Sequence, residues 1–175
     1  MDLRFGYPAV VDEVSVRLVA AVVLVIATVA AVGGLWWLYA ALALDFVLRA
    51  AYGPRRSPIA QLVVRWLRPR VALPSRPTAG PPKRFAAGIG AGCTLSAAMA
   101  GAIAANSPSG SAPVATAILL AIGVVMVVFP ALEAFAGRCV GCLIFARLIR
   151  WGAVSESTCL ECADLTRRAS AAAQA

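Results

Sequence analysis

Four cysteines arranged as two Cys-x-x-Cys pairs are the residues of this chain best suited to chemistry. Cys139 and Cys142 form the first pair, sixteen residues follow, and Cys159 and Cys162 form the second. This spacing falls within the range of four-cysteine zinc sites. Four thiolates would close a tetrahedral structural site, which leaves no open position for catalysis at the metal.

The same cysteines are also suited to thiol–disulfide exchange. Thr158 could cap a helix beginning at Cys159, and a helix N-terminus lowers the pKa of a thiol. Cys139 and Cys142 could then exchange disulfides with the second pair or with a thioredoxin-like protein. A third hypothesis leaves all four as reduced thiols without a role, and the sequence leaves the three open.

Three charged residues lie in or beside apolar runs and form a second candidate group: Asp45, Arg49 and Glu133. An isolated carboxylate within a membrane is unfavourable by ~2.5 kcal/mol or more. Arg49 lies four residues after Asp45, on the same helical face, and can pair with it, while Arg138 could neutralise Glu133. We expect the Asp45–Arg49 pair to be structural. The alternative is a proton or substrate relay through Asp45 and Glu133.

The composition indicates a membrane protein. Of the 175 residues, 61% are hydrophobic and 14% charged, against about 45–50% and about 25% in a soluble domain. The net charge of +8 does not indicate nucleic-acid binding, because the basic residues flank apolar runs. The absence of histidine excludes Ser-His-Asp triads, zincins and histidine-ligated haem.

The apolar runs predict an all-α fold with four transmembrane helices arranged as two antiparallel hairpins. Gly33-Gly34 and Trp36-Trp37 interrupt the first long run, and we expect a tight turn there. Within the third span, Gly88, Gly92 and Ser96, and then Ala97 and Gly101, follow the small-xxx-small spacing that lets helices approach closely. The expected spans are residues 14–32, 35–52, 85–105 and 114–137.

The segment 53–84 between the hairpins is basic and contains no acidic residue. An apolar stripe with helical spacing begins after Ser57-Pro58 and predicts a short amphipathic helix in the inner interface, where it would contact anionic lipid. We expect five prolines to keep the following chain extended: Pro69, Pro74, Pro77, Pro81 and Pro82. After the fourth span, residues 143–151 form an amphipathic continuation.

The distribution of charge predicts the orientation. The two expected outer loops contain no Lys or Arg, so both termini should be cytoplasmic. We divide the chain into a transmembrane domain, residues 1–152, and a cytoplasmic cysteine-bearing tail, residues 153–175. The N-terminus lacks the basic region of a cleavable signal peptide.

Several motifs resemble a bacterial membrane-protein family known as domain of unknown function 4395. They are Ala43-Leu-Asp-Phe46, Leu48-Arg49, Pro54-Arg-Arg-Ser-Pro58, Arg68-Pro-Arg70, Pro82-Lys-Arg-Phe-Ala-Ala-Gly-Ile-Gly90, Leu132-Glu-Ala, Gly137 and Cys139-Val-Gly-Cys142. The resemblance implies a four-helix domain in the bacterial inner membrane. It also implies a link to thioredoxin-like or sulfur-transfer proteins, and no established activity.

Three functions follow as hypotheses. The first is a cytoplasm-facing thiol-redox or sulfur-relay component that serves a thioredoxin-like partner and is not an enzyme by itself. The second is a non-enzymatic scaffold or subunit of a larger membrane complex, with a zinc-held tail. The third is a small transporter that uses Asp45 and Glu133.

Overall fold

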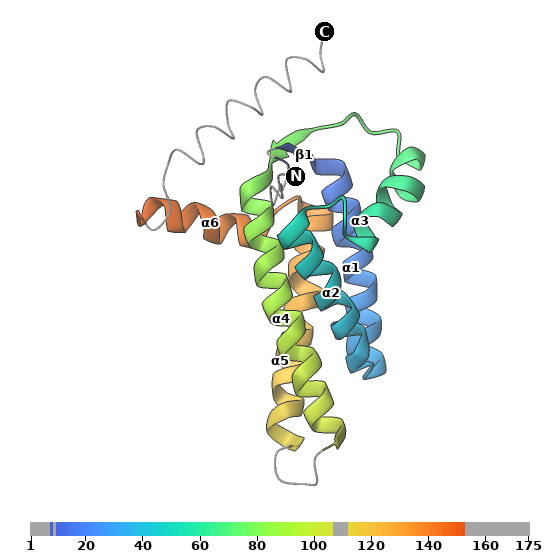
Figure 1. The fold of residues 1–175 in the computed structure, drawn as a ribbon, viewed down its shortest axis with the longest axis vertical. Coiled ribbons are helices and arrows are strands. Elements are labelled where there is room, and N and C mark those ends of the chain that lie inside the picture. The colour runs from blue at the N-terminus through green and yellow to red at the C-terminus, as the bar shows by residue number, and fades with distance from the viewer. Residues whose placement is uncertain (1–7, 9, 107–111, 153–175) are drawn as a thin grey trace, which may run out of the picture.

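The computed structural model describes residues 8, 10–106 and 112–152, and they form a helical bundle with a small two-stranded sheet (Figure 1). The sheet, α3 and α6 gather at the end of the bundle where α1 and α4 begin and α2 and α5 end. We call this the basic end. The elements are β1 (Val10–Asp12), α1 (Glu13–Gly33), α2 (Trp36–Tyr52), α3 (Pro58–Leu62), a π-helical segment (Val63–Leu67), a 3-10 turn (Arg68–Arg70), β2 (Pro77–Ala79), α4 (Gly80–Asn106), α5 (Ala112–Ala136) and α6 (Val140–Arg150).

The fold is helical, as expected, and three helices are long and apolar enough to cross a membrane. They are α1, α4 and the Pro113–Ala136 part of α5. The remaining bundle helix, α2, has 17 residues and is therefore about 26 Å long, against a hydrocarbon core of ~30 Å. Four spans remain a prediction.

Gly34 ends α1 at the expected turn. Its φ of 65° lies in the left-handed region, and its N–H donates to the Ala30 carbonyl. This is a glycine C-cap, and α2 begins two residues later. The most extensive helix contacts, however, join α2 to α4, α1 to α5 and α4 to α5. Helices α1 and α2, predicted to be hairpin partners, contact each other much less.

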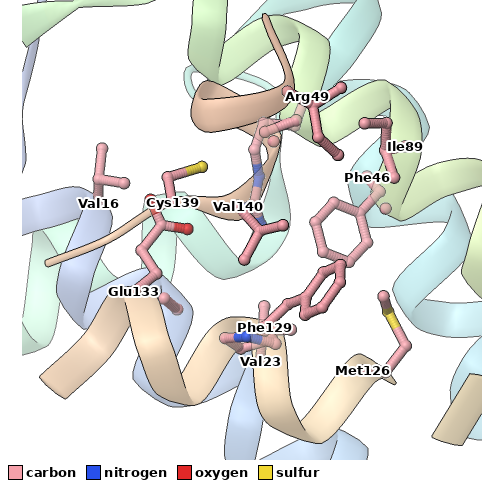
Figure 2. Close-up of a pocket in the computed structure, with 16 residues that line it drawn as sticks. Val16, Val23, Phe46, Arg49, Ile89, Met126, Phe129, Glu133, Cys139 and Val140 are labelled. Atoms are coloured by element: carbon pink, nitrogen blue, oxygen red, sulfur yellow. The ribbon is translucent and has the colours of Figure 1, made fainter. Parts of the chain in front are cut away.

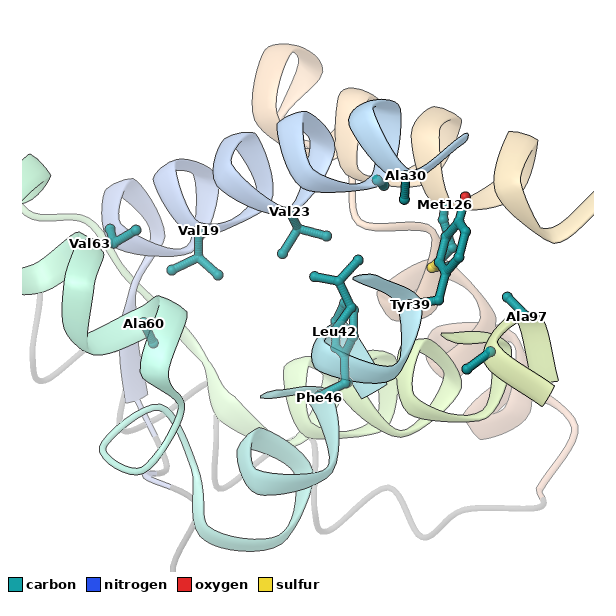
Figure 3. Close-up of a cluster of buried hydrophobic side chains, with 13 residues drawn as sticks. Val19, Val23, Ala30, Tyr39, Leu42, Phe46, Ala60, Val63, Ala97 and Met126 are labelled. Atoms are coloured by element: carbon teal, nitrogen blue, oxygen red, sulfur yellow. The ribbon is translucent and has the colours of Figure 1, made fainter. Parts of the chain in front are cut away.

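The core lies where α2 faces α1 and α4 (Figure 3). Tyr39 and Leu42 of α2 are each 1% exposed and pack with Val23 of α1 and Ala97 of α4. The small side chains on α1 and α4 leave space that the larger side chains of α2 fill. Large residues on one helix must face small residues on the next if the interior is to be closely packed. Helix α2 is thus held by packing along its length.

Of the glycines of α4 predicted to permit close packing, Gly101 does so, whereas Gly88 and Gly92 do not. Gly88 and Gly92 face outward, and nothing lies within 4 Å of the position of an added Cβ. At Gly90 an added Cβ would lie 2.7 Å from the Phe46 ring, and at Gly101 it would overlap the side chain of Trp36. Gly90 and Gly101 therefore set the distance between α4 and α2.

Three local expectations at the basic end are wrong. The chain after the short helix is not extended throughout, because Pro69 lies in the 3-10 turn. It is extended at Pro77, where β2 pairs antiparallel with β1 and places Val11 opposite Thr78. Helix α4 begins at Gly80, so Pro81 and Pro82 lie in its first turn, where a missing N–H leaves no bond unmade. Residues 143–151 do not continue α5, because Gly137, at φ 65°, separates α5 from α6. Helix α6 projects sideways from the bundle (Figure 1).

We predict that Gly101→Ala destabilises the protein by about 1–3 kcal/mol, since the added methyl group must displace Trp36. Gly92→Ala is the matched control. It meets no atom within 4 Å, and the better helix propensity of alanine should stabilise it by up to about 1 kcal/mol. Unfolding of both variants in the same detergent measures the difference, and equal stability would contradict the assigned packing face.

Candidate functional site

Cys139 and Cys142 lie at the N-terminus of α6. Cys139 is the N-cap residue, with extended backbone at ψ 113°, and Cys142 lies in the first turn. Residues three apart on a helix face each other, and the Cys142 thiol donates a hydrogen bond to the Cys139 sulfur. Cys139 is 8% exposed, whereas Cys142 is half-buried. The pair has the arrangement of a helix-terminal dithiol.

Glycine between the two cysteines lets α6 pack directly on α4. A Cβ at Gly141 would overlap the Cβ of Ala86, so no larger residue fits without moving one helix. The rings of Phe85 and Phe145 meet beside this contact, with centroids 5.5 Å apart. The close approach brings the first turn of α4, including Lys83, beside the cysteines.

Lys83 forms an ion pair with Glu133 of α5, and both side chains are mostly buried. The positive charge of Lys83 acts on both cysteines, and the negative charge of Glu133 opposes it. The partner of Glu133 is therefore Lys83, fifty residues away in the chain, and not Arg138, as the sequence suggested. The four side chains interact electrostatically where α4, α5 and α6 meet.

The environment shifts the pKa values of the two thiols in opposite directions. The hydrogen bond from Cys142 lowers the pKa of Cys139, and the Lys83 ammonium adds to this, against the opposing effects of burial and of Glu133. The same bond and burial raise the pKa of Cys142. Cys139 is thus the thiol that ionises first, and a thiolate is the nucleophile in disulfide exchange. Cys142 holds its proton.

The second cysteine pair, Cys159 and Cys162, lies outside the described residues. Within the described part of the chain, no group of three or more His, Cys, Asp or Glu residues could hold a metal ion. A zinc site would therefore need both pairs.

Asp45 joins the end of α2 to the start of α3. It is 2% exposed and forms an ion pair with Arg49. It also accepts hydrogen bonds from Ser57 Oγ at 2.6 Å and from the Ile59 N–H at 3.0 Å. Ser57 in turn caps α3 through the Ala60 N–H. These partners occupy Asp45 structurally, and none of them links it to Glu133.

Asp12 makes a corresponding set of contacts that the sequence analysis missed. It caps α1 through Ser15 and accepts hydrogen bonds from Arg68 Nε at 2.9 Å, Ser75 Oγ at 2.9 Å and the Arg76 N–H at 3.1 Å. Partial burial raises the pKa of Asp12, but these hydrogen bonds outweigh it and hold the pKa well below its ordinary value. The acid immediately before an apolar run was a visible N-cap signal.

Two arginines close the ends of neighbouring helices at the basic end. Arg17 of α1 donates to the carbonyls of Ala134 and Phe135 at 3.2 and 2.9 Å, and Arg84 of α4 donates to the Ala50 carbonyl at 2.9 Å. The last carbonyls of a helix lack intrahelical partners and carry partial negative charge. Each arginine satisfies them on the antiparallel neighbour.

Two adjoining cavities open among the helices at this end. The smaller, about 90 Å³, is lined by Cys139 and Glu133 on one side and by Phe46, Phe129 and Met126 on the other (Figure 2). The larger, about 370 Å³, extends toward β1 and the start of the 53–84 segment. Five residues line both: Val16, Phe46, Arg49, Ala86 and Glu133.

The fold and the site define a helical membrane protein that carries a dithiol beside a partly charged cavity. A family model described as Domain of unknown function (DUF4395) matches residues 11–150, and the chain belongs to this family. The match includes Cys139 and Cys142 and ends before the second pair. Comparison with curated proteins and with solved structures gives no match.

We predict that Asp45→Asn destabilises the protein by about 3 kcal/mol, because it leaves the largely buried Arg49 guanidinium without its counter-charge. The control is Glu13→Gln, which removes a partly exposed pair at 4.0 Å and should change stability by less than about 1 kcal/mol. Denaturant unfolding in detergent measures both. Wild-type stability of Asp45→Asn would contradict the structural role.

We predict that Cys142→Ala raises the pKa of Cys139, because it removes the main hydrogen bond to the thiolate. The variant carries serine at positions 93, 159 and 162, so that iodoacetamide reports on Cys139 alone. Its pH profile of alkylation should move to higher pH, and the rate at pH 7 should fall severalfold. Cys142→Ser retains a hydroxyl donor and should lie between alanine and cysteine. Superimposable profiles would rule out the coupling.

Proposed function

We propose that this protein is a membrane-bound dithiol that exchanges disulfides at its basic end, with Cys139 as the attacking residue and Cys142 as the resolving residue. One observation carries the proposal. A buried cysteine occupies the N-cap position of α6, accepts a hydrogen bond from the second cysteine of its pair, and lies within the electrostatic influence of the Lys83 ammonium. A helix N-terminus and a nearby cation are the features that favour a reactive thiolate.

The exchange proceeds in two balanced steps. The Cys139 thiolate attacks one sulfur of a substrate disulfide, which forms a mixed disulfide and releases the other sulfur as a thiolate that takes up a proton. Cys142 then loses its proton and attacks the Cys139 sulfur, which forms the Cys139–Cys142 disulfide and releases the second thiol. The substrate is reduced by two electrons, and the pair is oxidised by two.

We propose that α2 is a fourth span and that the basic end faces the cytoplasm of a bacterium, with both termini there. In support, the basic residues of segment 53–84 and Arg147 and Arg150 of α6 belong to elements at this end. Trp66, 59% exposed, and Trp151, 75% exposed, supply apolar surface suited to the membrane interface. Anionic lipid of the inner leaflet would neutralise the arginines.

The return step requires a reductant, and we propose a thioredoxin-like protein for this role. Its dithiol would attack Cys142, the more exposed member of the pair, reduce the Cys139–Cys142 disulfide and become a disulfide itself. The cytoplasm keeps such proteins reduced. The protein would then act as a relay between that partner and a substrate.

We predict that the purified chain, with serine at positions 93, 159 and 162, forms one reversible Cys139–Cys142 disulfide in glutathione buffers. Peptide mass spectrometry and the loss of two free thiols measure it. Cys139→Ser and Cys142→Ser should each prevent its formation. A pair that stays reduced in strongly oxidising buffer would contradict the proposal.

The unmodified chain provides a second control. One tightly bound zinc per chain, lost on changing a residue of either pair, would favour the structural-zinc scaffold instead. A membrane-impermeant maleimide added to intact cells should leave Cys142 unmodified and should modify it in inside-out vesicles. Labelling in intact cells would reverse the proposed orientation.

A further inference from the structure

The attacking sulfur faces the interior of the protein. Cys139 is 8% exposed and lines the smaller cavity, opposite Phe46, Phe129 and Met126 (Figure 2). The disulfide of a folded protein cannot enter a space of about 90 Å³ without displacing these walls. The larger cavity adjoins this space, with which it shares five lining residues, and it offers a small molecule more room beside the sulfur.

The larger cavity has the dimensions of a ligand site. Its volume of about 370 Å³ lies within the ~300–1,000 Å³ typical of small-molecule pockets. Its walls are mostly apolar, with valines from β1 and α1 and alanines from α4, and a few charged groups converge on it. A mostly apolar pocket with a few placed polar groups is the usual form of such a site.

The charge left unpaired around this cavity is positive. Of its acids, Asp12 is paired with Arg68 and Glu133 with Lys83. Arg55, an exposed residue on the wall, has no ion-pair partner among the residues that the structure describes. Arg49, whose charge is paired with Asp45, lines both cavities, and its Nε is buried without a hydrogen-bond partner in the described part of the chain. An anionic group would supply the counter-charge that Arg55 lacks and a further acceptor for Arg49.

We propose that the substrate of the dithiol is a small disulfide carrying a carboxylate, held in the larger cavity by Arg49 and Arg55 with its sulfurs toward Cys139. This inference rests on the proposed exchange activity and names its substrate class. The two carboxylate-bearing thiols leave through the same cavity. The thioredoxin-like protein acts afterwards on the half-buried Cys142. Cys139 therefore reacts with the small disulfide, and Cys142 reacts with the protein partner.

Three small disulfides of different charge test the inference on the purified chain with serine at positions 93, 159 and 162. They are 3,3′-dithiodipropionate with two carboxylates, neutral 2-hydroxyethyl disulfide, and cystamine with two ammonium groups. Each rate of Cys139–Cys142 disulfide formation is divided by the rate of the same reagent with neutral dithiothreitol, which removes intrinsic reactivity. We expect the order dithiodipropionate, hydroxyethyl disulfide, cystamine.

A matched pair of variants locates the effect. Arg55→Gln should lower the normalised preference for dithiodipropionate over the neutral reagent by about fivefold, the loss of one favourable charge interaction. Arg56→Gln removes the adjacent arginine, which lies over the Tyr52 ring at 4.8 Å and does not line the cavity, and should leave the preference unchanged. Equal loss in both variants would show general attraction to a basic surface and would overturn the assigned site.

The remaining outcomes separate the inference from the proposed function. If no disulfide, small or protein-borne, oxidises the pair, the exchange activity itself is wrong. If the pair is oxidised at rates independent of reagent charge, or faster by oxidised thioredoxin than by dithiodipropionate, the exchange activity stands and the small anionic substrate is wrong.

Discussion

Neutralisation of buried carboxylates is the constraint on which the basic end depends. Asp45 and Glu133 are largely removed from water, and Asp12 is partly so; an unpaired charge is unfavourable in such surroundings. Asp12 joins the start of α1 to residues 68–76, Asp45 joins α2 to α3, and Glu133 joins α5 to α4. Because each acid needs partners from another element, its ionisation holds these elements together, and the termini of the bundle helices are fixed more firmly than apolar contacts alone would fix them.

The same constraint places the groups around the dithiol. Lys83 is held by Glu133, so its ammonium cannot extend to water as a surface lysine would. Arg17 and Arg84 are held by the carbonyl ends of α5 and α2. The positions of the cations are therefore set by the fold, and the electrostatic field at Cys139 follows from interactions whose primary role is structural.

Local patterns predicted much of the fold, and long-range pairings did not emerge from them. Continuous apolar runs and the Gly33-Gly34 turn indicate helices directly, and Asp45 with Arg49 is an i, i+4 pair that a sequence displays. Lys83 and Glu133 are fifty residues apart, and the partners of Asp12 extend from Ser15 to Arg76. Such long-range pairs can be identified only in the folded structure. The packing face of α4 was assigned only in part, because small residues occur on every side of that helix and the large side chains of α2 decide which glycines are needed.

The dithiol and its cavity have a common origin in the break at Gly137. Helix α5 ends at Ala136 and α6 begins at Val140, so the break between them places Cys139 at a helix N-terminus. The chain turns at Gly137, and Gly141 allows α6 to lie against Ala86. The turn leaves a space walled by the last residues of α5 and the first of α6, with Cys139 at its edge. One change of direction thus produces both the helix N-terminus at which the sulfur lies and the space beside it.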